Sequence, residues 1–232
     1  MGLAGWLGGG PERKHAKLAR SAPSGALGGY AATPLPARTL DVAAVPLLAI
    51  DMETTGLDPA RDHILSIGWV PVDGRVITLA GAGRVLVRPP AGVGASATIH
   101  GLTDDAVQAG ISVEEALDVV LPALTGRVLL AHYARIETSF LDAAARRRYG
   151  TGLPFQVVDT MELARRILTR GGAFGEPKSG ALRLWTARGR YGLPTYAAHD
   201  ALIDALACAE LYLAQVAEIS QDQPLALARL LS

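Results

Sequence analysis

Four acidic residues stand in apolar surroundings at widely separated positions of this 232-residue chain. Asp51 closes an apolar run that begins at Val45, and the two-residue period of a strand places Glu53 on the same side as Asp51. Glu137 and Asp204 each share a face with apolar residues at helical spacing. A lone carboxylate is costly there, so it must be neutralised, paired with a base or bound to a cation. If the three segments meet, a hard divalent ion with oxygen ligands is the natural partner.

The local context of the acids follows a recognisable order. The first two lie in Asp51-Met52-Glu53-Thr54-Thr55-Gly56 after a strand pattern, and His199 stands five residues before Asp204. Two further segments, Ile99-His100-Gly101-Leu102-Thr103 and Val158-Asp159-Thr160, lie between them. From Leu47 to Leu213 these motifs resemble the DnaQ-like superfamily of 3′–5′ exonucleases, in the DEDD branch whose last motif contains a histidine.

The middle acidic motif departs from the pattern of that superfamily. The usual sequence is His-Asn-Ala-x-Phe-Asp, whereas this chain has His132-Tyr133-Ala134-Arg135-Ile136-Glu137. The carboxylate is therefore kept, with a side chain one methylene longer.

The resemblance implies a role for each acid in phosphodiester hydrolysis, assisted by two Mg²⁺ or Mn²⁺ ions about 3.5–4 Å apart. Asp51, Glu53 and Asp204 would hold the ion that activates water. Asp51 would also bridge to the second ion, which Glu137 would support directly or through water. His199 would act as general base, because an imidazole with an ordinary pKa near 6.5 accepts a proton around neutral pH.

The same resemblance implies a binding site for the 3′-terminal nucleotide. The backbone and side chains that follow the first motif would hold this nucleotide, with Leu57 wedged against the base. The expected substrate-binding residues are Thr54, Thr55, Leu57, His100, His132 and Ile136.

Composition indicates a globular protein. Half of the residues are hydrophobic, and 22 basic residues balance 22 acidic ones, so no overall positive field favours a polyanionic partner. The single cysteine, Cys208, excludes an intrachain disulfide and fits a reducing compartment. The chain shows neither a signal-peptide pattern nor a long uninterrupted apolar stretch. We therefore expect a cytoplasmic protein without a membrane partner.

The pattern along the chain divides it into three parts. Residues 1–44, rich in Gly, Ala and Pro, form an N-terminal extension that we expect to pack loosely; residues 45–218 form the exonuclease domain, and residues 219–232 form a tail. We expect an α/β domain of the ribonuclease H-like class, with a mixed five-stranded sheet flanked by helices. Strands are expected near 47–51, 64–72, 128–131 and 156–158, with one or two between 75 and 87; helices are expected after the capping box at 112–115 and at 136–149, 160–169, 181–190 and 201–216.

The predicted activity is metal-dependent 3′–5′ hydrolysis that releases nucleoside 5′-monophosphates from single-stranded DNA. Two alternatives stay open: an RNA-directed exonuclease of the same superfamily, and a non-catalytic domain that binds nucleic acid or a polymerase. The expected partners are single-stranded 3′ ends, with a DNA polymerase or a second copy of the chain as candidate protein partners.

Overall fold

A mixed sheet forms the centre of the computed structural model, which describes residues 10–21, 23–90, 107–170, 177–197 and 199–232. The sheet has six strands in the order β3-β2-β1-β5-β6, and β4 also pairs with β2. Strand β1 runs antiparallel to β2 and parallel to β5, and β6 extends the parallel side. The strands are β1 (Pro46–Thr54), β2 (Ile64–Asp73), β3 (Val76–Ile77), β4 (Gly83–Leu86), β5 (Val128–Ala131) and β6 (Val157–Asp159).

The expected mixed sheet is confirmed, and its strand count differs from five for a local reason. Strand β3 pairs with the end of β2 at Val72 and Asp73, whereas β4 pairs with the stretch of β2 from Ser66 to Trp69. Since β1 takes the other edge of β2, both short strands lie along the same edge. A 3₁₀ turn at Leu79–Gly81 separates them. Six strands therefore fill five positions.

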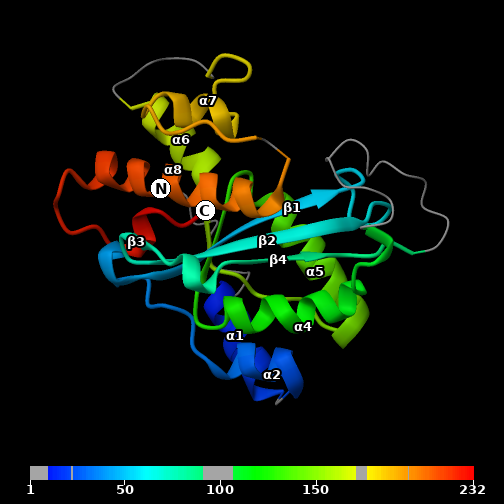
Figure 1. Ribbon diagram of the computed structural model, residues 1–232. Helices are drawn as coiled ribbons and strands as arrows, with labels where there is room; N and C mark the ends of the chain where they lie inside the picture. Colours follow the sequence, from blue (N-terminus) through cyan, green and yellow to red (C-terminus); the bar gives the residue numbers. More distant parts are fainter. Residues whose placement is uncertain (1–9, 22, 91–106, 171–176, 198) are drawn as a thin grey trace.

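Helices cover both faces of the sheet (Figure 1). Helix α8 packs across β1 and β2 on one face, with α6 and α7 beyond it, whereas α4 and α5 cover the other face. Within the described residues, none of these helices is long and apolar enough to cross a membrane. The helices are α1 (Pro11–Arg20), α2 (Gly25–Ala32), α4 (Val113–Leu124), α5 (Arg135–Tyr149), α6 (Thr160–Leu168), α7 (Leu184–Gly189) and α8 (Ala201–Ser220).

Strand β1 contributes to two separate cores because its side chains alternate between the faces. Leu47 and Ala49 pack in the core under α8, whereas Leu48, Ile50 and Met52 pack in the core under α4 and α5. Continued along the strand, this alternation directs positions 51 and 53 to the α8 side.

The expectation of a loosely packed extension is wrong for its two helices. Leu18 of α1 and Leu27 of α2 belong to the same buried core as α4 and α5. Tyr30 is buried, and its hydroxyl donates a hydrogen bond of 2.6 Å to the Pro154 carbonyl. The Gln156 side-chain amide donates to the Glu12 carboxylate on α1. A composition rich in Gly and Ala suggests loose packing. In this chain, however, the small residues of α2 let that helix lie close against α4. The division of the chain at residue 44 stays a prediction.

The C-terminal segment also folds back onto the domain. Leu227 and Leu230 are fully buried in the core under α8, and Ser232 donates its backbone N–H to Val157 at the edge of the sheet. The C-terminal segment therefore covers part of the free edge of β6, the last strand of the sheet.

Removing a core side chain from α2 should test the role of the extension. We expect Leu27→Ala to lower the free energy of unfolding by about 2–5 kcal/mol, because a buried leucine is replaced by a cavity. Urea unfolding measures the change, with Val119→Ala on the exposed side of α4 as the control. Equal unfolding midpoints for the wild type and Leu27→Ala would show that α2 contributes nothing to the core.

Candidate active site

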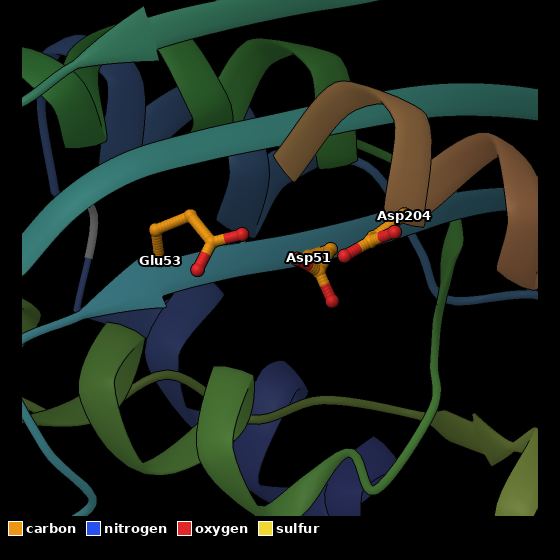
Figure 2. Close-up of side chains that lie close together, drawn as sticks. All are labelled: Asp51, Glu53 and Asp204. Atoms are coloured by element: carbon orange, nitrogen blue, oxygen red, sulfur yellow. The ribbon is translucent and has the colours of Figure 1, made fainter. Parts of the chain in front are cut away.

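Asp51 and Glu53 lie near the carboxyl end of β1 on the side that faces α8 (Figure 2). Glu53 is buried, and Asp51 is partly buried beneath the first turns of the helix. Asp204 reaches toward Asp51 from α8. The strand and the helix therefore present three carboxylates to one small region.

A close approach between α8 and β2 brings Asp204 to the strand. Gly68 of β2 pairs with Asp51 of β1, and a Cβ atom at Gly68 would lie 2.2 Å from the Ala201 carbonyl carbon. The absence of a side chain thus allows the first turn of α8 to rest directly on β2. Asp204 follows less than one turn later, beside Asp51.

The three carboxylates form a compact cluster. Asp51, Glu53 and Asp204 each offer one ligand oxygen, and these oxygens all lie within 4.8 Å of one another. Glu137 is outside this set; it is buried on the first turn of α5, and its charge adds to burial in raising the pKa of Asp51. The structure therefore brings three of the four expected acids together and places the fourth close by.

Burial and mutual repulsion make these acids hard to ionise together. Burial raises the pKa of Asp51 well above its ordinary value, and the charges of Glu137, Asp204 and Glu53 raise it further. Burial raises the pKa of Glu137 to about 8. Burial also raises the pKa of Asp204, although the hydrogen bond from the His199 backbone acts in the opposite direction.

The donor set fits divalent cations. All of the donors are carboxylate oxygens, which suit Mg²⁺ and Mn²⁺. Oε2 of Glu137 and Oδ1 of Asp204 are buried without a hydrogen-bond partner among the described residues. A buried carboxylate oxygen without a donor normally needs one, and a cation would satisfy it.

His199 stands directly before α8 in an unusual backbone conformation. Its φ of 69° lies in the left-handed region, which residues other than glycine seldom adopt. Its backbone N–H donates a hydrogen bond of 3.1 Å to Oδ2 of Asp204, and its side chain is exposed. The expected base therefore lies at the edge of the acidic cluster, with its backbone tied to one of the acids.

Asp159 anchors the segment that carries Glu137. Its carboxylate accepts hydrogen bonds of 3.0 Å from the backbone N–H groups of Tyr133 and Ala134, just before α5. The same carboxylate caps α6 through the N–H of Met161. Tyr133 also has a φ of 69°. Asp159 thus fixes the start of α5 and holds a strained residue there.

The expected substrate residues after β1 adopt a tight loop. Thr54 donates its hydroxyl to the Gly56 carbonyl, and the Thr55 hydroxyl accepts a hydrogen bond from the backbone of His63. Leu57 is 73% exposed, which leaves an apolar side chain open to solvent beside the loop. An exposed leucine here is compatible with contact to a base.

The remaining expected substrate residues differ in their surroundings. Both ring nitrogens of His132 have protein partners, the Thr160 hydroxyl and the Leu182 carbonyl, each at 2.8 Å. His132 therefore joins β5 to α6 and to the turn before α7. Ile136 is partly buried against the core under α5. His100 and its motif lie outside the described residues.

Two positioning residues have no role in the sequence analysis. Gly68 carries no sequence signal of its own beyond an interruption in an apolar strand. Asp200, the N-cap of α8, also forms an ion pair with Arg84 of β4, and its charge raises the pKa of Asp51. An aspartate before a helical pattern is a capping signal, so the cap was open to prediction, whereas its partner on β4 was not.

Known sequences similar to this chain include an exonuclease family and components of DNA polymerase III. A family model described as exonuclease matches residues 48–212. The DNA polymerase III subunit epsilon of Treponema pallidum is 30% identical over 174 residues, which cover 75% of this chain and 77% of that protein. The PolC-type DNA polymerase III of Thermotoga petrophila is 29% identical over 72% of this chain. The matched segment spans only 11% of that polymerase.

Solved structures with a similar fold include two nucleases. The nuclease domain of 3′hExo, described as a DEDDh family member and bound to rAMP, aligns with a TM-score of 0.61 and 16% identity over 77% of this chain and 95% of that domain. Escherichia coli Exonuclease I, solved with a dT13 oligonucleotide, aligns with a TM-score of 0.62 and 17% identity over 76% of this chain and 42% of that protein. These likenesses confirm the expected fold class.

The stability of the metal-free protein should fall as pH rises. The pKa of Glu137 is raised from 4.5 in its ordinary state to about 8 in the folded protein. Between these values the unfolded chain releases a proton that the folded protein keeps, so the free energy of unfolding decreases with pH. Urea unfolding in EDTA at several pH values measures this slope.

Two comparisons assign the slope to the site. Glu137→Gln should show a shallower decrease in stability, since its amide does not titrate. Mn²⁺ should stabilise the wild type more at pH 8 than at pH 5.5, because the cation and the proton compete for the same oxygens. Identical pH slopes in the wild type and Glu137→Gln would contradict this account.

Proposed function

We propose, since this chain belongs to the exonuclease family, that it hydrolyses single-stranded DNA from the 3′ end and releases nucleoside 5′-monophosphates. The observation that carries the proposal is the cluster of Asp51, Glu53 and Asp204, whose oxygens lie within 4.8 Å of one another inside the matched segment. Two divalent cations, Mg²⁺ or Mn²⁺, would supply charge stabilisation for an in-line displacement at phosphorus when bound.

The proposal gives each residue a distinct task. Asp51, Glu53 and Asp204 would hold one cation between them. Glu137 would support the second with Oε2, which has no hydrogen-bond partner among the described residues. His199 would take the proton from the attacking water, which its exposed ring at the edge of the cluster allows. The hydrogen bond from its backbone to Asp204 keeps the base and the cation ligands in a fixed relation.

DNA is the proposed substrate because the two sequence relatives described above are named as a DNA polymerase III and as a subunit of one. The relative from Treponema pallidum aligns over 77% of its length and is named as a subunit of DNA polymerase III. By the same reasoning, a DNA polymerase is the proposed protein partner. RNA is the alternative substrate, and the assay below compares the two directly.

The direction of hydrolysis is tested with end-blocked oligonucleotides. Single strands with an internal label should be shortened stepwise from a free 3′ hydroxyl and should resist hydrolysis when that end is blocked. Chelation by EDTA should abolish the reaction, and Mn²⁺ or Mg²⁺ should restore it. Cleavage of a circular single strand, or unchanged activity in excess EDTA, is incompatible with the proposal. Matched DNA and RNA strands identify the preferred substrate.

Replacement of His199 tests the proposed base. We expect His199→Ala to lower the turnover number by about 10²–10⁴-fold, the usual contribution of general base catalysis. The affinity for Mn²⁺ should change little, because the side-chain oxygens of the cluster remain. His63→Ala, in the loop after β1, serves as the histidine control. Near-normal turnover of His199→Ala, with the chemical step shown to be rate-limiting, would remove His199 from the mechanism.

Two substitutions at Glu137 separate charge from reach. Glu137→Gln should lower turnover sharply, because it removes a negative charge that supports the second cation. Glu137→Asp keeps the charge and shortens the side chain by about 1.5 Å, close to a carbon–carbon bond. We expect this variant to retain activity, since a water molecule can span the remaining gap. If Glu137→Gln and Glu137→Ala both keep wild-type turnover and metal dependence, Glu137 is only a helix-start acid.

A further inference from the structure

Arg188 is a fully buried cation that the proposed chemistry does not use. It lies on α7, and its side chain is 1% exposed. Its guanidinium donates to the Pro194 carbonyl at 2.8 Å, to the Glu210 carboxylate at 2.7 Å and to the Ala207 carbonyl at 2.5 Å. Arg188 therefore joins three segments: its own helix, the loop that follows it, and α8.

Two aromatic rings complete this arrangement. The guanidinium carbon lies 5.3 Å from the centre of the Trp185 ring and 5.2 Å from that of the Tyr196 ring. The Tyr196 hydroxyl donates to the other oxygen of Glu210 at 2.9 Å. Stacking of a guanidinium on aromatic faces adds to its ion pair. We name Trp185, Arg188, Tyr196 and Glu210 the arginine clamp.

The clamp holds the loop that leads to the proposed base. Pro194 and Tyr196 are both fixed to α8 through Arg188 and Glu210. His199 follows Tyr196 by three residues and is fixed on its other side by the hydrogen bond to Asp204. The described residues 194–197 and His199 are thus attached to α8 on both sides of residue 198.

The backbone of His199 needs such attachment. A φ of 69° is strained for a residue with a side chain, so the conformation persists only if neighbouring contacts impose it. Asp204 supplies the contact on one side, and the clamp is the attachment on the other.

Stability alone is a weak reason to bury an arginine here. Replacing a buried ion pair with apolar side chains of similar volume is often neutral or stabilising. The Nε atom of Arg188 is also buried without a hydrogen-bond partner among the described residues. A residue that gives little stability and fixes a specific loop is better explained by positioning.

We propose that the arginine clamp is a positioning device that holds His199 in its catalytic conformation. The inference rests on the proposed role of His199 as general base. Arg188 touches no ligand of the acidic cluster in the contacts above, although its charge opposes the rise that burial causes in the pKa of Asp204. The proposed route to His199 is the loop, and the Mn²⁺ affinity measured below separates this route from an effect on the cluster.

The test compares a clamp variant with a matched control. Arg188→Met combined with Glu210→Met removes both charges and fills the space, so the protein should fold. The control is Arg166→Met, which removes an arginine that ties α6 to the carbonyls of Arg229 and Leu231. The Mn²⁺ affinity and the KM should stay within about twofold in both proteins, whereas turnover should fall by about 10–10²-fold only in the clamp variant, the usual effect of a misplaced group. Unchanged turnover in the clamp variant would overturn the proposal.

A double-mutant cycle shows whether the loss acts through His199. In a His199→Ala background, the clamp substitutions should cause almost no further loss, because the group that they position is already absent. An equal loss in both backgrounds would overturn the proposal, since it would show a general effect on the fold. If His199→Ala alone changes nothing, the proposed base is wrong.

Hydrogen exchange gives a readout that needs no activity. Peptides that cover residues 194–200 should exchange faster in the clamp variant, whereas peptides from α4 and α5 should not change. If the double variant fails to fold, Tyr196→Phe replaces it in this experiment. This substitution removes a single hydrogen bond and should show the same effect more weakly. Unchanged exchange in this loop would overturn the proposal even if the wild type hydrolyses no nucleic acid.

Discussion

Three carboxyl groups with oxygens within 4.8 Å of one another impose the main constraint on this fold, because they are hard to ionise together. Asp51 and Glu53 cannot separate, because they lie on one side of a strand whose pairing with β2 continues through both positions. Asp204 cannot withdraw, because α8 rests on the bare backbone of Gly68. The repulsion is therefore built into rigid elements, and a bound cation would relieve it.

The backbone segments directly before α5 and α8 are each held by a hydrogen bond to an aspartate carboxylate. Tyr133 and His199 both have a φ of 69°, and each donates its backbone N–H to an aspartate, Asp159 for the first and Asp204 for the second. A charged acceptor makes these hydrogen bonds stronger than neutral ones, which offsets part of the backbone strain. At these two positions the strained residue stands just before a helix that carries one of the acids.

The sequence predicted the parts of this architecture that have a local signature. Alternation placed Asp51 and Glu53 on one side of β1, the capping box at Ser112 and Glu115 is present at the start of α4, and helical spacing placed Glu137 and Asp204 on buried faces. Local patterns do not predict the packing of α1 and α2 against the core. They also do not predict the contacts of the arginine clamp between Arg188, Tyr196 and Glu210. Those features depend on contacts between distant segments, which a periodic pattern cannot specify.

The middle motif shows why its departure from the usual sequence is compatible with the site. Asp159 accepts hydrogen bonds from backbone N–H groups, so these contacts in the turn before α5 do not involve the side chain at position 133. An asparagine would adopt the left-handed conformation there more easily than Tyr133 does. With the helix start fixed in this way, the extra methylene of Glu137 changes only the reach of a carboxylate from a constant origin. Burial and the charge of Glu137 both raise the pKa of Asp51, so the longer side chain still acts on the cluster.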